Sequence, residues 1–208
     1  MSKKVLVICG DQYHSGDHVM AGLSASVDEQ FDLIQASDGP ILEFSDSYSA
    51  IVLAKLNVSS PSDTTPWASE ISGKALCEFV SRGSGLLVVH AGTVGYSIAP
   101  GIDELTGGSF IQHPSACDVT IEPVADHHLT KDTIAFTIHD EHYFVEHTDQ
   151  GEVFLLTRSE HGVQPGGWTR TFGRGRVCVL TPGHFESVWS HPQFHSLVRN
   201  GLGWITHG

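Results

Sequence analysis

The segment Gly85–Val89, "GLLVV", is the sequence feature that most constrains how this chain can fold. Its apolar residues are continuous and do not alternate with polar ones, which is typical of a strand covered on both faces in a parallel sheet. His90 follows directly, at the position where loops of α/β proteins carry ligand-binding residues. The sequence therefore predicts an α/β fold and makes His90 a candidate functional residue.

Other segments extend this pattern along the chain. Further apolar strands are predicted over residues 4–9, 31–36 and 50–54. Amphipathic spacing predicts helices over residues 16–30 and 67–81. The resulting order, β-α-β-β-α-β, implies right-handed crossovers and a mostly parallel sheet.

The pattern changes after residue 116. Shorter, alternating segments over residues 117–124, 133–147 and 153–159 predict an antiparallel excursion. A buried strand over 176–181 and a helix over 192–206 follow. Residues 58–66 and 97–102 are expected to be loops. No repeat or linker interrupts the chain, so we expect one α/β domain over residues 1–208.

Composition narrows the classes of partner. The formal net charge is -13, with 24 acidic and 11 basic residues. Nucleic acids and anionic membranes attract clustered cations, so neither is an expected partner. No stretch reaches the roughly 20 apolar residues of a membrane helix. The four cysteines form no C-x-x-C pair, so we expect reduced thiols and a cytoplasmic protein.

Histidine is unusually frequent, with 14 copies in the 208 residues. Three of them follow predicted core strands: His14 after the first, His90 after the central one and His184 after the last. Carboxyl ends of parallel strands share one edge of the sheet, so we expect these imidazoles to meet there. The motif "HDEHY" adds Glu141 and Tyr143 from the excursion. The remaining histidines outside this motif and "QHP" are interpreted as surface or hydrogen-bonded residues.

Three imidazoles and a carboxylate suit a divalent metal such as zinc, manganese or iron. They suit metal-free acid–base catalysis equally well. We therefore predict His14, His90 and His184 as metal ligands, and His90, Glu141 and His184 as catalytic residues, with Glu141 a ligand or the general base. The "GRGR" segment at 173–176 precedes a strand, so it predicts a hairpin turn and no nucleotide cofactor.

Six motifs in order resemble the ThuA-like family, named for trehalose utilisation. They are "CGDQYH", "GLLVVHAG", "GGSFIQHP", "DEHY", "GWTRTFGRGRVCVLTPGH" and "HPQFHSLVRNGLGW". The resemblance implies a flavodoxin-like three-layer sandwich similar to class I glutamine amidotransferases. Those enzymes carry a nucleophilic cysteine after the central strand and a late H-x-E pair. Here His184 and Glu186 match that pair, but His90 stands at the turn, so glutamine amidotransfer is not expected.

The resemblance also implies a role in carbohydrate catabolism. We expect an isomerase, epimerase or lyase acting on a sugar or keto-sugar. The alternative is a non-catalytic sugar-binding or regulatory partner of a sugar oxidoreductase, and a homo-oligomer is compatible with either. Substrate contacts are predicted for Asp11, His113, Tyr143, Trp168 and Arg170. Tyr143 and Trp168 are candidates to stack on a sugar ring, although Trp168 fits the core equally well.

Overall fold

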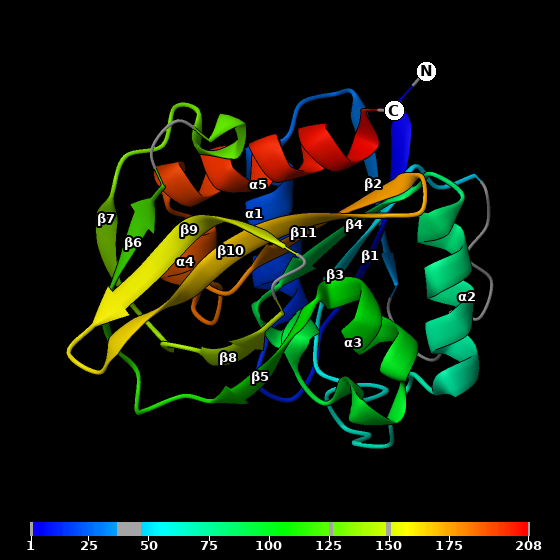
Figure 1. Ribbon diagram of the computed structural model, residues 1–208, viewed down its shortest axis with the longest axis horizontal. Coiled ribbons are helices and arrows are strands. Elements are labelled where there is room, and N and C mark those ends of the chain that lie inside the picture. The colour runs from blue at the N-terminus through cyan, green and yellow to red at the C-terminus, as the bar shows by residue number, and fades with distance from the viewer. Residues whose placement is uncertain (1, 37–46, 125–126, 149–150, 208) are drawn as a thin grey trace.

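The computed structural model describes residues 2–36, 47–124, 127–148 and 151–207, and Figure 1 shows its arrangement. A sheet of nine strands runs through the described residues in the order β2-β1-β3-β4-β11-β10-β9-β6-β7. Its strands are β1 (Lys3–Cys9), β2 (Phe31–Ala36), β3 (Ala50–Ala54), β4 (Gly85–Val89), β6 (Cys117–Pro123), β7 (Phe136–Asp140), β9 (Glu152–Ser159), β10 (Gly162–Phe172) and β11 (Gly175–Leu180). The larger helices are α1 (Gly16–Ser26), α2 (Glu70–Ser81), α3 (Pro100–Thr106), α4 (Glu186–Trp189) and α5 (Pro192–Thr206).

The sheet has a parallel half and an antiparallel half. Strands β2, β1, β3, β4 and β11 all pair in parallel. Strands β10, β9, β6 and β7 pair antiparallel, and β10 joins β11 through the predicted hairpin. The predicted α/β class, the β-α-β-β-α-β order of elements along the chain and the antiparallel excursion are therefore confirmed.

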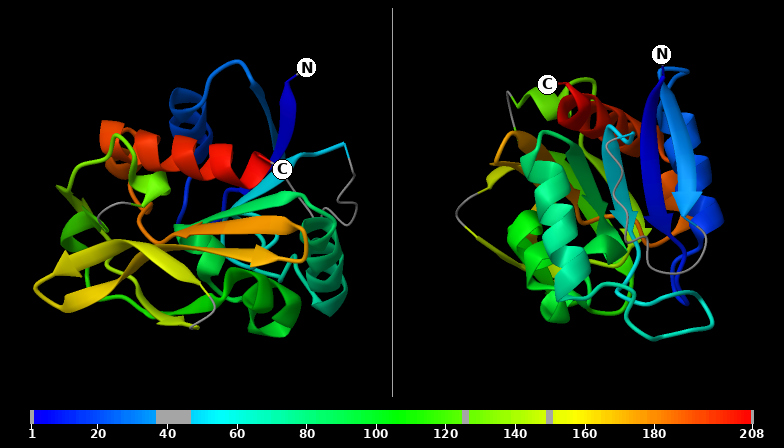
Figure 2. Two further views of the ribbon diagram at one scale, coloured as in Figure 1. Left: turned by 45° about the horizontal axis from the view of Figure 1, so that its top comes forward. Right: turned by 90° about the vertical axis from the view of Figure 1, so that its right-hand side faces the viewer.

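Helices cover both faces of the sheet, as Figure 2 shows. Along β1, Val5 and Val7 pack in the core with residues of α1 and α5, whereas Leu6 and Ile8 pack with residues of α2 and α3. Alternate side chains of one strand point to opposite faces, so a strand covered on both sides needs an unbroken apolar run. This explains why the central strands read as continuous apolar segments.

Two predicted helices are shorter in the structure than in the sequence analysis. The first, expected to reach residue 30, ends at Ser26 because Val27 is extended (φ -115°, ψ 162°). The second, expected from residue 67, begins at Glu70 because Ser69 is extended and its backbone N–H donates to Ser72 Oγ at 2.8 Å. Side-chain hydrogen bonds of this kind mark helix starts, which apolar spacing alone does not locate.

The segment expected as a loop over 97–102 contributes to helix α3, which the sequence analysis missed. Pro100 stands in its first turn, and Gly107 ends it with a positive φ of 63°. Proline at a helix start and glycine just after its end are known signals for short helices. A separate ribbon of β5 (Gly108–Gln112) and β8 (Phe144–His147) follows. This ribbon carries His113 and Tyr143 at its ends.

We predict opposite effects for two glycine-to-alanine substitutions. Gly92 lies in the turn after β4 (3-10 helix η1, His90–Thr93), where a Cβ would collide with the Leu53 carbonyl oxygen and approach Val88 Cγ1 to 2.9 Å. Gly92→Ala should lower the free energy of unfolding by about 1–3 kcal/mol, because the backbone cannot yield freely. Gly203 lies inside α5 with open space around it, so Gly203→Ala should raise that energy by about 0.5–1 kcal/mol.

Urea denaturation of the two variants and the wild type measures both effects. Equal midpoints for Gly92→Ala and the wild type would show that the turn after β4 tolerates a side chain.

Candidate functional site

Three histidines meet at the carboxyl edge of the parallel strands. His14 follows β1, His90 follows β4 and His184 follows β11. Their ring centroids lie 5.1 Å (His14 to His90), 4.9 Å (His14 to His184) and 5.6 Å (His90 to His184) apart. The expected convergence of these imidazoles is therefore present in the structure.

His90 is held in a strained and buried position. Its φ is +45°, in the left-handed backbone region that residues other than glycine rarely adopt, and the residue is 1% exposed. Its Nδ1 lies 2.7 Å from the Thr181 carbonyl oxygen. Since a carbonyl oxygen only accepts, Nδ1 carries the proton and Nε2 of the neutral ring has a free lone pair. Burial lowers the pKa of His90, which favours this neutral form.

The Nε2 atom of His90 is buried and makes no hydrogen bond to any described residue. Its nearest carboxylate oxygen is Glu141 Oε2 at 3.4 Å, which does not meet the geometry of a hydrogen bond. Buried polar atoms without partners are rare and point to a missing ligand or ion.

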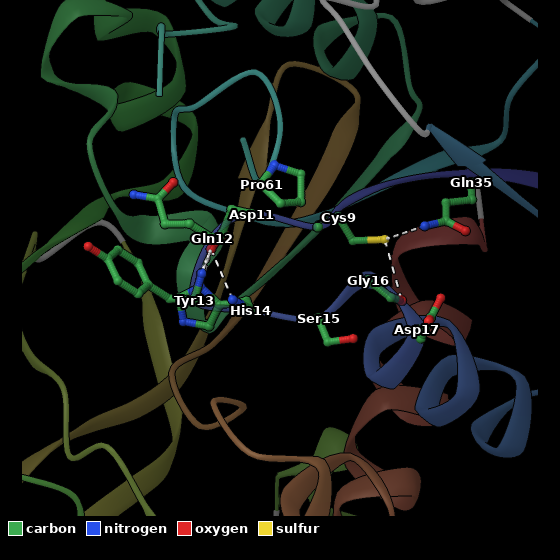
Figure 3. A pocket seen from close by; sticks show the side chains of 11 residues that line it. Cys9, Asp11, Gln12, Tyr13, His14, Ser15, Gly16, Asp17, Gln35 and Pro61 are labelled. Atoms are coloured by element: carbon green, nitrogen blue, oxygen red, sulfur yellow. Dashed lines mark hydrogen bonds and ion pairs between the residues drawn. The ribbon is translucent and has the colours of Figure 1, made fainter. Parts of the chain in front are cut away.

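Asp11 fixes the loop that carries His14, as Figure 3 shows. Its Oδ1 accepts the backbone N–H of Tyr13 (2.9 Å) and of His14 (3.0 Å), and lies 2.8 Å from His14 Nδ1. Its Oδ2 accepts the Leu56 backbone N–H at 2.9 Å. Burial alone would raise the pKa of Asp11, but these hydrogen bonds, led by that from His14, lower it. Asp11 therefore positions His14, and it is not among the residues that line the cavity beside the cluster.

Glu141 faces three imidazoles. Its Oε2 lies 3.1 Å from His184 Nδ1 and 3.4 Å from His90 Nε2, and its Oε1 lies 3.5 Å from His113 Nε2. Burial would raise the pKa of Glu141, but the contacts with His184 and His90 outweigh it and hold the pKa well below the usual range. The contact with Glu141 in turn raises the pKa of His184.

Asp140 orients the loop that carries His184. Its two oxygens accept the backbone N–H groups of Gly183 (2.9 Å) and His184 (3.0 Å). Gly183 has a φ of +143°, and a Cβ there would approach His90 Cβ to 3.1 Å. The close packing of these two turns thus requires glycine at this position. Asp140 is buried, which raises its pKa.

The four side chains can offer ligand atoms to one ion. One donor atom from each of His14, His90, Glu141 and His184 lies within 4.8 Å of the other three. His14 Nε2 and His184 Nδ1, for example, are 3.2 Å apart. A tetrahedral metal with bonds of about 2.0–2.1 Å separates its ligands by about 3.3 Å, so the spacing suits a divalent cation.

A cavity of about 370 Å³ opens beside this cluster. It is lined by Tyr13, His14, Leu56, Val94, Phe110, His113, Glu141, Tyr143 and His184. No lysine or arginine is among these lining residues. A second hollow of about 580 Å³ is lined by residues of the β1–α1 loop and shares Tyr13 and His14 with the first cavity (Figure 3). The predicted residues His113 and Tyr143 thus border the cavity.

Three predicted residues lie elsewhere. Trp168 is fully buried and its Nε1 donates to the Thr106 carbonyl at 2.7 Å, so it belongs to the core and the predicted stacking on a sugar is wrong. Arg170 donates to the Glu104 carbonyl at 2.5 Å and does not line the cavity. Glu186 is exposed and lies 3.5 Å from His18 Nε2, so the carboxylate beside His184 is Glu141.

The cavity also contains residues that sequence reasoning missed. Leu56, Val94 and Phe110 form apolar wall, and Tyr13, 67% exposed, stands at the mouth. A large exposed aromatic beside a candidate ligand, His14, is a signal that the sequence offered for Tyr13. Leu56 and Val94 carry no such signal, because their place depends on how the loops after β3 and β4 meet.

Comparison with known proteins identifies the family. A family model described as ThuA, trehalose utilisation, matches residues 4–205. The chain belongs to the ThuA family. No curated protein matches the sequence.

Solved structures show the ThuA fold at low sequence identity. A ThuA-like protein from Parabacteroides merdae ATCC 43184 has a TM-score of 0.78 at 16% identity, over 100% of this chain and 91% of that chain. One from Bacteroides uniformis ATCC 8492 has a TM-score of 0.73 at 18% identity, over 98% and 91%. A β-galactosidase from Rahnella sp. R3 has a TM-score of 0.65 at 14% identity, over 98% of this chain but 31% of its own. In the described part of this chain, no helix combines the length and apolar character of a membrane span.

We predict a pH-dependent loss of stability in Glu141→Gln after chelator treatment. Glu141 has a lowered pKa, so its contribution to the stability of the fold is complete above the ordinary pKa of 4.5 and is lost as pH falls. His184 has a raised pKa, so its contribution to the stability of the fold is complete below the ordinary pKa of 6.5 and is lost as pH rises. The difference in Tm between the variant and the wild type should be largest between these two values.

Thermal melts across pH 4–9 measure this difference. Glu186→Gln is the matched control, because its carboxylate is exposed and pairs with His18, outside the cluster. An equal effect of both variants at every pH would contradict the pairing of Glu141 with His184.

Proposed function

We propose that this protein is a metal-dependent enzyme of carbohydrate catabolism that isomerises, epimerises or eliminates a neutral sugar or keto-sugar. The single observation that carries the proposal is the buried, unpartnered Nε2 of His90. This atom lies close to the Glu141 carboxylate and to the imidazoles of His14 and His184. Those three residues line the cavity. Burying four such groups together is costly unless an ion compensates for it.

The protonation pattern supports metal binding. The Nδ1–H of His90 donates to the Thr181 carbonyl, and the Nδ1–H of His14 donates to Asp11, so the Nε2 atoms of both neutral rings have lone pairs. Carboxylate and carbonyl partners of this kind commonly orient histidine ligands of metals. Without an ion, the 3.2 Å contact of His14 Nε2 with His184 Nδ1 requires a proton on one of them.

Glu141 completes the set as an anionic ligand. Its low pKa keeps the carboxylate ionised, which suits a ligand better than a general base near neutral pH. Imidazole and carboxylate together suit zinc, manganese or iron. A bound divalent metal would supply Lewis-acid stabilisation of negative charge on a sugar oxygen. His113 lies outside the four ligands and borders the cavity, so it is placed to contact the substrate.

The cavity favours an uncharged substrate. Phosphate groups are usually bound by lysine, arginine or a helix N-terminus, and the lining residues include no such cation. Its apolar and aromatic wall faces the polar ligand cluster, which matches a sugar with both apolar and hydroxyl-bearing surfaces. The family's description, trehalose utilisation, points to the same class of compound.

The proposal extends to the layer architecture of the fold and to the location of the protein. Helices on both faces of the sheet support a flavodoxin-like three-layer sandwich related to class I glutamine amidotransferases. Free cysteines and the metabolic role support a cytoplasmic location. The alternative of a non-catalytic sugar-binding protein would use the same cavity, and the presence or absence of turnover distinguishes the two.

We predict that the purified protein binds one divalent metal per chain and that His90→Ala loses it. Loss of a neutral histidine ligand should weaken metal affinity by at least the roughly 10–100-fold that loss of an outer partner causes. Elemental analysis after dialysis measures the metal content. His161→Ala is the control, because His161 is exposed and lies outside the cluster. Equal metal content in both variants would contradict the proposed site.

We also predict that activity follows the metal. A panel of neutral sugars and keto-sugars, compared with their phosphate esters, should show turnover of the neutral compounds only. A strong chelator and the substitution His184→Ala should each abolish that turnover. Full turnover by His184→Ala or by the chelated protein would contradict the metal-dependent mechanism. A preference for a phosphate ester would contradict the proposal of a neutral substrate.

A further inference from the structure

Tyr143 is a nearly buried residue that lines the cavity, and its hydroxyl has no hydrogen-bond partner among the described residues. Tyr143 is 3% exposed, and its hydroxyl makes no hydrogen bond to any residue in the described ranges. The residue lines the cavity beside Glu141 and His184. Tyrosine hydroxyls inside a fold usually find a protein partner. A hydroxyl without one, on a residue that lines a cavity, is available to a ligand in that cavity.

A second buried tyrosine shows what a structural role looks like in this protein. Tyr96 is 1% exposed, donates to the Lys55 carbonyl at 2.8 Å and accepts from Trp67 Nε1 at 3.3 Å. Its hydroxyl is thus fully used within the fold. The contrast indicates that the Tyr143 hydroxyl does not stabilise the fold and is available to bind a ligand.

The ring of Tyr143 is clamped from several sides. His90 stacks on it at a centroid distance of 3.8 Å and an interplanar angle of 26°. His113 lies nearly parallel at 5.8 Å, and Phe110 packs at 4.5 Å. Such packing fixes the direction of the hydroxyl, so a ligand oxygen can be met without loss of side-chain freedom.

We propose that Tyr143 is a catalytic residue whose Oη donates a hydrogen bond to the sugar oxygen that gains negative charge during the reaction. This rests on the proposed function, since it names a group acting on that same substrate. No proton is transferred: the phenol stays neutral and stabilises the charge as a fixed donor. Removing one such donor from an enzyme typically lowers kcat by about 10²–10³-fold.

The test compares Tyr143→Phe, Tyr96→Phe and the wild type, each loaded with the metal. Tyr143→Phe should keep its metal and its Tm, because no protein partner is lost. Tyr96→Phe should lower Tm by at least about 2–4 °C, because it removes the hydrogen bonds of the Tyr96 hydroxyl with the Lys55 carbonyl and the Trp67 N–H. The ligand probe is glycolohydroxamate, a small mimic of a planar enediolate, titrated by calorimetry.

Tyr143→Phe should bind glycolohydroxamate at least about 10-fold more weakly than the wild type, and Tyr96→Phe equally well. Wild-type affinity in Tyr143→Phe, or a loss of Tm like that of Tyr96→Phe, would overturn the role of Tyr143 and leave the metal site standing. A wild type that binds neither metal nor glycolohydroxamate would overturn the proposed function, and this inference with it.

Discussion

The imidazole of His90 is the element on which the rest of the site depends. Parallel pairing of β4 with β11 sets Val89 opposite Leu180, so the next residue of each strand, His90 and Thr181, can meet. The Thr181 carbonyl then fixes the ring and its tautomer. The turn at His90 is strained, with a positive φ, and strain of this kind is a feature of functional sites.

Two buried aspartates organise the neighbouring loops in the same manner. Asp11 accepts backbone N–H groups from the loops after β1 and β3, and Asp140 accepts those after β11. A buried carboxylate is costly unless it is fully hydrogen-bonded, and each aspartate meets that condition through backbone donors. The loops are therefore rigid where His14 and His184 leave them, which suits a site that must hold several side chains at short distances.

Much of the candidate site could be predicted because it follows strand ends. Three histidines stand just beyond the apolar runs of β1, β4 and β11, and parallel strands bring such positions to one edge. The choice between Glu141 and Glu186 could not be made in this way. Glu186 is two residues from His184 in the chain, yet α4 carries it to the surface beside His18. The β7–β8 connection instead returns Glu141 to His184.

The sequence by itself determined the α/β class, the order of helices and strands along the chain and the shared edge, because unbroken apolar runs and strand-end positions are local properties of the chain. Only the tertiary structure decided which side chains enter the cavity. Trp168 lies at a register shift between β10 and β9, and its ring packs where Gly108 leaves room, so it faces the core. Tyr143 and His113 reach the cavity through the β5–β8 ribbon. The reason is physical: such placements depend on contacts between segments far apart in sequence, which no local pattern encodes.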